Sequence, residues 1–120
     1  MENISMYVLD EQSRQKLIAK FPPKYPNFIG HHVTVDIGKD ISLPKQAVLK
    51  VTGYVDSGDG LEVLVVTVDG TTRRQDGGMY HITWSLDPTK YKPKNSNDLV
   101  KSKEYTLIRS IPITTTPEVK

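Results

Sequence analysis

The sequence predicts an α+β protein made mostly of antiparallel β-sheet, with one or two helices packed outside it. Short runs rich in Val, Ile, Thr and Tyr alternate with turn sequences, which is typical of strands. The turn DSGDG between two apolar runs indicates a β-hairpin, and only one stretch has clear helical periodicity. The 120 residues predict a single domain over residues 1–112, followed by a C-terminal tail over 113–120.

The N-terminal part of the chain predicts a strand followed by the one clear helix. The strand covers Ile4–Leu9, and Asp10 is a suitable N-cap for a helix that begins directly after it. Pro22 and Pro23 end this helix. Its buried face is expected to consist of residues spaced at i, i+3, i+4 and i+7, namely Arg14, Leu17, Ile18 and Phe21.

The next strand, over residues 31–37, begins with two adjacent histidines. Alternation predicts one face made of His32, Thr34 and Asp36 and an opposite face made of His31, Val33 and Val35. His31 is therefore expected to have a structural role, and its replacement is expected to do little to any chemistry. A bulge or a slip in register would exchange the two histidines.

Four further strands are predicted in the rest of the chain. Ala47–Val55 and Leu61–Val68 flank the DSGDG turn, and the nearly continuous apolar character of the second predicts a central strand. Met79–Leu86 is the third, with His81, Thr83 and Ser85 on one face and Tyr80, Ile82, Trp84 and Leu86 on the other. A helical turn over residues 98–103 and a last strand over 104–113 complete the prediction.

Composition excludes several kinds of site. The chain has no cysteine, so it has no disulfide, thiolate metal site or cysteine nucleophile. The net charge of +2 does not indicate a nucleic-acid coat protein, although it allows a local basic groove. There is no signal-peptide pattern and no apolar run of the roughly 20 residues that span a membrane. A cytoplasmic location without a membrane partner is therefore expected.

The pattern His-x-Thr occurs twice on a predicted strand, as His32-Val33-Thr34 and as His81-Ile82-Thr83. Two imidazoles that face one phosphate can act as base and acid, because a histidine pKa of about 6.5 allows both forms near neutral pH. The two threonine hydroxyls can donate hydrogen bonds to phosphate oxygens on which charge develops. The pattern therefore predicts cleavage of a phosphodiester without a metal.

Two such motifs, each on a strand, resemble the signature of the 2H phosphoesterase superfamily. The stretch HITWSLDPTKYKPKNSNDL looks like the second-motif region of its small phage and RNA-repair members, which include phosphodiesterases that cleave cyclic-nucleotide signals. The resemblance implies a compact 2H phosphoesterase-like fold, with the sheet around a central cleft and one motif on each of two lobes. It implies His32 and His81 as the catalytic pair, Thr34 and Thr83 as phosphate ligands, and no metal or other cofactor.

The same resemblance implies the substrate class. The expected substrate is a nucleotide or RNA phosphodiester: a 2′,3′-cyclic phosphate, a 2′,5′ linkage or a cyclic oligonucleotide signal. For a phage protein the expected location is the host cytoplasm. Candidate substrate contacts, which are equally compatible with packing or with solvated loop charges, are Tyr7, Arg73, Arg74 and Lys90.

Three alternatives remain open at this point. A zinc site formed by His31, His32 and His81 is the weakest, because adjacent strand residues point apart and the usual ligand spacings are missing. The second alternative is a nucleotide-binding module without activity. The third is a structural or adaptor domain of a phage, in which the two triplets are a coincidence. No obligate protein partner is implied, and the oligomeric state is left open.

Overall fold

Ten secondary-structure elements follow one another in the residues that this computed structural model describes, 3–102 and 105–120. They form two antiparallel sheets and two helices, which confirms the α+β class and the antiparallel pairing predicted from the sequence. In chain order they are β1 (Asn3–Leu9), α1 (Glu11–Lys20), β2 (Asn27–Phe28), β3 (His32–Gly38), β4 (Leu49–Asp56), β5 (Leu61–Val68), β6 (His81–Leu86), α2 (Asn95–Ser102), β7 (Thr106–Ile113) and β8 (Thr115–Val119).

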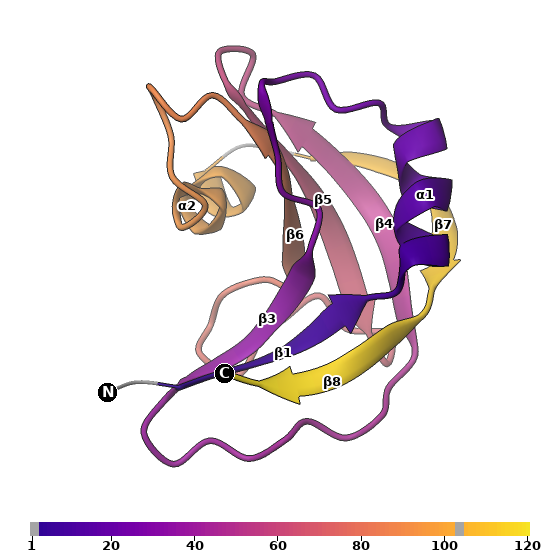
Figure 1. Ribbon diagram of the computed structural model, residues 1–120, viewed down its shortest axis with the longest axis vertical. Coiled ribbons are helices and arrows are strands. Elements are labelled where there is room, and N and C mark those ends of the chain that lie inside the picture. Colours follow the sequence, from indigo (N-terminus) through magenta and orange to yellow (C-terminus); the bar gives the residue numbers. More distant parts are fainter. Residues whose placement is uncertain (1–2, 103–104) are drawn as a thin grey trace.

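The strands divide between a small sheet and a large one (Figure 1). The small sheet has the order β3-β1-β8, and the large sheet has the order β2-β6-β5-β4-β7. β5 lies at the centre of the large sheet with all but one of its side chains buried, as its apolar sequence predicted. β4 and β5 pair from Leu49 and Val68 to Asp56 and Glu62, and this confirms the hairpin around DSGDG.

Two hydrophobic clusters cover the two faces of the large sheet. The larger cluster lies between the two sheets and beneath α1, and it includes Leu17, Val33 and Trp84. The smaller cluster contains Val100 of α2 together with Val63 and other residues of the large sheet. The two helices therefore lie on opposite sides of the large sheet (Figure 1). α1 packs outside, as predicted, whereas α2 helps to form the pocket described below.

The first helix begins as its sequence predicts. Asp10 accepts a hydrogen bond from the backbone N–H of Ser13 at 2.7 Å, which is the expected N-cap. Leu17 is completely buried, and the other three residues of the predicted face are half-buried. Ser13 is buried as well, because its Oγ accepts the N–H of Thr114 at 2.7 Å. This bond attaches α1 to the junction between β7 and β8.

The C-terminal segment differs from the prediction of a loose tail over residues 113–120. Residues 115–119 form β8, which pairs with β1 from Leu9 and Thr115 to Ser5 and Val119. β8 is an edge strand, so Pro117 can lie in it without removing a hydrogen bond from a second neighbour. Without β8, β1 would itself be an exposed edge. The prediction failed because neither the proline nor the short threonine run shows which strand is available to pair with it.

Each strand that carries a His-x-Thr triplet has one extra residue directly after the threonine. In β3, Thr34 pairs with Met6 and Asp36 pairs with Ser5, so one residue, Val35, has no partner on β1. In β6, Thr83 pairs with Val63 and Ser85 pairs with Glu62, so Trp84 is the extra residue. Both irregularities are β-bulges, in which two residues of one strand lie opposite one residue of the next.

These bulges reverse the predicted alternation beyond the threonines. Asp36 does not share the face of His32; it lines a separate cavity, and Ile37 lies in the pocket with His32 instead. Ser85 was predicted on the face of His81, but its hydroxyl donates to the buried carboxylate of Glu62 on the side of the larger cluster. The predicted faces are therefore right through Val35 and Trp84, which lie in or against the larger cluster as expected, and wrong from Asp36 and Ser85 onward.

Candidate functional site

One pocket of about 240 Å³ is lined by both His-x-Thr triplets. β3 contributes His32 and Thr34, and β6 contributes His81 and Thr83. These two strands lie close together although they belong to different sheets. The remaining lining residues come from β1, the segment before β3, the far end of β3, the connection before β6 and the region of α2: Ile4, Ile29, Ile37, Arg74, Pro93, Lys94 and Asn97.

Backbone hydrogen bonds tie the start of β3 to β6. The N–H of Gly30 donates to the carbonyl of Thr83 at 3.0 Å, and the N–H of Ile29 donates to the carbonyl of Trp84 at 2.9 Å. Two residues after Gly30 the chain reaches His32. The first triplet is therefore connected to the second through its own backbone, and this sets how far apart the two histidines can lie.

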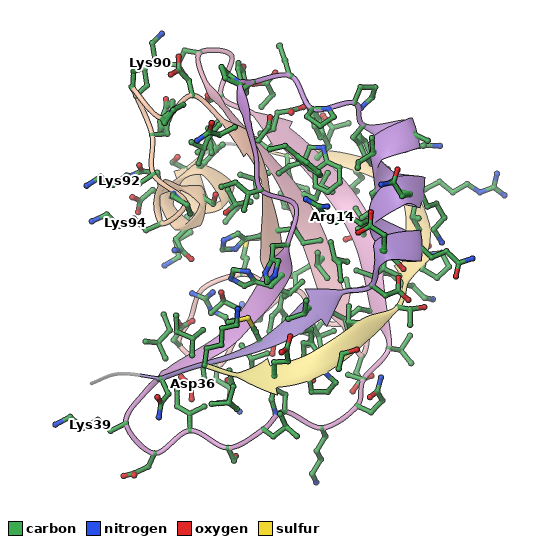
Figure 2. All side chains as sticks on the ribbon, in the orientation of Figure 1. Arg14, Asp36, Lys39, Lys90, Lys92 and Lys94 are labelled. Carbon is green, nitrogen blue, oxygen red and sulfur yellow. The ribbon has the colours of Figure 1, made fainter. Side chains whose placement is uncertain are left out.

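Gly30 and Arg14 hold this connection in place. Gly30 has a φ of +45°, and a Cβ built on it would lie 2.5 Å from the Phe28 ring, so only glycine fits. Arg14 reaches from α1 toward this segment (Figure 2), where its Nε donates to the Gly30 carbonyl at 2.9 Å. Its guanidinium also lies 4.5 Å from the centre of the Phe28 ring, a cation–π contact. Arg14, which was predicted on the buried face of the helix, thus also holds the segment that leads into β3.

His32 is held by its neighbour and is uncharged at neutral pH. Its Nδ1 lies 3.1 Å from Nδ1 of His31, and the two rings meet edge to face at 77°. Burial, followed by the nearby His31, Lys120 and His81, lowers the pKa of His32 from its ordinary value to about 4. His31 is exposed and does not enter the core, contrary to the face predicted for it.

His81 is held by the backbone. Its Nδ1–H donates to the carbonyl of Met79 at 2.8 Å, which fixes the neutral ring with an unprotonated Nε2. No buried side-chain nitrogen or oxygen of the described residues lacks a partner, so Nε2, which has none there, is reachable by solvent. Burial lowers the pKa of His81, and Arg74 contributes to this, whereas the bond to Met79 opposes it. His81 therefore presents an unprotonated Nε2 that can accept a proton.

The two threonines differ in what their hydroxyls already bind. Thr83 is buried, with its Oγ1 2.7 Å from the Oγ of Ser96 and 3.3 Å from the carbonyl of Pro93. Thr34 is half-buried, and within residues 3–102 and 105–120 its hydroxyl has no hydrogen bond. The Thr34 hydroxyl is consequently ready to donate to a ligand, while that of Thr83 is shared with α2.

Arg74 is the cation that is fixed at the pocket. Its Nε donates to Asp76 at 2.9 Å and its guanidinium donates a second bond to Asn97 at 3.1 Å, while only 9 % of its surface is exposed. Lys94 lines the same pocket from the start of the α2 region. Two positive charges against the one carboxylate of Asp76 suit this pocket to an anion.

The other three candidate contacts lie elsewhere. Tyr7 is buried, and its hydroxyl donates to the carbonyl of Lys45 at 2.7 Å at a different cavity. Arg73 lines a separate surface depression beside α2. Lys90 is exposed at the outer end of the loop between β6 and α2, whereas Lys94 lies beside α2 (Figure 2). Of the four, the structure brings only Arg74 to the two triplets.

The sequence prediction missed Asn97 and the isoleucines of the pocket wall, whereas Lys94 belongs to the loop lysines that were expected to lie near phosphates if the site is right. The segment KPKNSND reads as an irregular loop because its lysines and asparagines show no periodicity. In the structure it enters α2 at Asn95, three residues earlier than the predicted helical turn. The turn places Asn97 against Arg74. In the sequence, the only sign that this segment belongs to the site is its position soon after the second triplet.

Neither a metal-binding cluster nor a membrane-spanning helix is found in the part of the chain that the structure describes. Among the described residues, no three histidines, aspartates or glutamates gather where they could hold a metal ion, so a zinc site of His31, His32 and His81 does not fit. In the same residues no helix is both long and apolar enough to cross a membrane. Comparison with family models, with curated proteins and with solved structures gives no match.

Proposed function

We propose that this protein is a metal-independent phosphodiesterase that hydrolyses a nucleotide or RNA phosphodiester. The observation that supports this most is the meeting of both His-x-Thr triplets in one pocket beside Arg74, from strands of two different sheets. The arrangement, with one triplet on each sheet, also agrees with the two-lobed layout that the resemblance to 2H phosphoesterases implies.

The residues divide the reaction between them. His81 takes a proton from water through its free Nε2, and the water oxygen forms a bond to phosphorus. The bond from phosphorus to the leaving ribose oxygen breaks, and His32 gives that oxygen a proton, a step that needs a positive charge on His32 or on a group hydrogen-bonded to it. The phosphate oxygens, which carry the growing negative charge, accept hydrogen bonds from Thr34 and Arg74.

The pocket accommodates part of a nucleotide. Its volume of about 240 Å³ is below the roughly 300–1,000 Å³ of sites that enclose a whole small-molecule ligand. One phosphate and the adjoining sugar fill it, and the rest of the substrate extends outside. This agrees with a 2′,3′-cyclic phosphate, a 2′,5′ linkage or a cyclic oligonucleotide as substrate.

The test is a substrate panel with these three classes, assayed in EDTA between pH 5 and 9. The wild type is expected to hydrolyse at least one of them, and His81→Asn to lose about 10³-fold in kcat/KM. Asparagine keeps a donor for the Met79 carbonyl and removes the base, so its fold should be intact by circular dichroism. Arg73→Ala is the matched surface control. Absence of turnover on the whole panel would reject the proposal.

One observation favours a second candidate, a nucleotide-binding module without activity. Both pocket histidines have lowered pKa values, so at neutral pH neither ring is positively charged, as a histidine that protonates a leaving oxygen needs to be. Calorimetric titration with a non-hydrolysable dinucleotide distinguishes the candidates, because a module of this kind binds the ligand and forms no product from any member of the panel.

A further inference from the structure

The rings of His31 and His32 lie so close that a hydrogen bond must join them. Their two Nδ1 atoms are 3.1 Å apart, which is hydrogen-bond distance, and two bare nitrogens or two N–H groups would repel each other there. One Nδ1 must therefore carry the hydrogen and the other must accept it. The tautomer of His32 is thus set by His31.

The surroundings decide which ring carries the extra proton when the pair is charged. His31 is exposed to water, whereas His32 is half-buried in the pocket with His81 on one side and Lys120 nearby. A positive charge is better solvated on the exposed ring. A charged His31 then donates from Nδ1, and His32 accepts at Nδ1 and keeps its hydrogen on Nε2.

The backbone fixes His31 in this place. Its carbonyl accepts the N–H of Leu9 at 3.0 Å, and the preceding Gly30 is held by Arg14 and by the carbonyl of Thr83. A surface side chain without such anchors would be free to leave its neighbour. The contact is therefore a built feature of the approach to β3.

We propose that His31 is a positioning residue that supplies, through His32, the proton taken by the leaving oxygen; this rests on the function proposed above. It answers the difficulty that His32 alone is uncharged at neutral pH. The acid is the exposed His31, which water can reprotonate after each turnover.

The step moves two protons and leaves both rings neutral. As the bond between phosphorus and the leaving oxygen breaks, Nε2 of His32 gives its hydrogen to that oxygen. In the same step Nδ1 of His31 gives its hydrogen to Nδ1 of His32. His31 loses the positive charge, His32 changes tautomer, and the leaving oxygen departs as a hydroxyl.

The first experiment compares two leaving groups. A ribose oxygen needs a proton to leave, whereas p-nitrophenolate leaves without one. We therefore expect His31→Ala and His31→Asn to lose about 30- to 100-fold in kcat/KM on the best phosphodiester of the panel, and less than about 3-fold on a p-nitrophenyl ester of the same nucleotide. Asparagine at this position keeps a donor for His32 but cannot give up its proton.

The outcomes separate this inference from the proposed function. Equal losses on both substrates, or full activity of His31→Asn on the ribose ester, would show that His31 only shapes or orients the site and would overturn the inference. Wild-type protein that turns over neither substrate would reject the proposed function and this inference together. The pH of maximal kcat/KM on the ribose ester should also move downward in His31→Asn, because His32 must then carry the proton itself.

A second measurement does not depend on activity. Nitrogen-15 spectra of the histidine rings distinguish a hydrogen on Nε2 from one on Nδ1. At a pH where His31 is charged, the wild type is expected to show His32 with its hydrogen on Nε2. A hydrogen on Nδ1 of His32 under that condition would overturn the inference even if the enzyme is active.

Discussion

The triplet on β3 and the triplet on β6 contain the same two residue types, yet they are held in different ways. His81 and Thr83 lie inside the large sheet, buried, and are bonded to the Met79 carbonyl and to Ser96 of α2. His32 and Thr34 lie on an edge strand of the small sheet, half-buried. There the histidine ring has a hydrogen bond only to another histidine, and the threonine hydroxyl has none, among the residues that the structure describes.

The difference indicates a division of labour between the two sides of the pocket. The β6 side is rigid and presents a lone pair whose direction the backbone fixes, which suits a base. The β3 side is closer to water and connected to it through His31, which suits a group that must be reloaded with a proton. Under the proposed function, two copies of one short motif would thus take different roles because their surroundings differ.

The largest effect is expected from a change at Gly30, whose backbone connects the start of β3 to β6. Gly30→Ala is expected to destabilise the protein by about 3 kcal/mol in urea denaturation, because the new Cβ collides with the rings of Phe28 and Trp84. Gly58→Ala is the control: its φ is also positive, at +87°, but nothing lies within 4 Å, so about 1 kcal/mol is expected. Similar losses in both variants would contradict the steric role of Gly30.

Replacing each threonine by valine sharpens the comparison further. Thr34→Val is expected to lower kcat/KM about 50-fold at unchanged stability, because its hydroxyl is free to bind phosphate. Thr83→Val should instead cost about 2 kcal/mol of stability, since Ser96 loses a buried partner. Thermal denaturation and steady-state kinetics on both variants measure this. Equal effects of the two substitutions would remove the distinction between the two sides.

The half-buried His32 predicts a pH dependence of stability. Its pKa of about 4 in the folded state is below the ordinary value of 6.5, so the unfolded chain binds the proton more tightly. Its contribution is complete above pH 6.5 and is lost as the pH falls toward 4, by about 2 kcal/mol after allowance for solvent screening. Urea denaturation at pH 7 and pH 4.5 should show a smaller loss in His32→Asn. The same loss in the variant would assign the dependence to other groups.

The smallest expected effect concerns the neighbouring arginines. Arg74→Gln is expected to raise KM about 10-fold, because the pocket loses a fixed positive charge. Arg73→Gln should leave KM unchanged, since that side chain lines a different depression. If the two variants gave the same KM, the anion would not be bound at Arg74.

Much of this arrangement can be predicted from the sequence by simple alternation. The strands other than β2 and β8, the hairpin at DSGDG and the N-cap at Asp10 depend on local patterns, and the structure confirms them. The proximity of the two triplets was predicted from the chemistry that two His-x-Thr patterns can perform together, and one pocket contains both. Their role in catalysis stays a prediction.

The parts that failed depend on interactions that no local pattern contains. Alternation cannot predict the extra residues Val35 and Trp84, because a bulge is defined only by the partner strand. The same limit applies to β8, whose partner is more than a hundred residues away. The contact between His31 and His32 depends on the positive φ of Gly30, which turns the chain just before β3.

The pairing of β1 with β8 has a consequence for how the molecule is made. Ser5 meets Val119, so the small sheet is complete only after β8 has paired with β1, from which it is separated by about a hundred residues. Contacts between such distant positions slow folding, because a long loop must close before they form. The large sheet, whose β4–β5 hairpin is local, is expected to assemble first. The pairing of β8 with β1 would then be the last step in completing the small sheet.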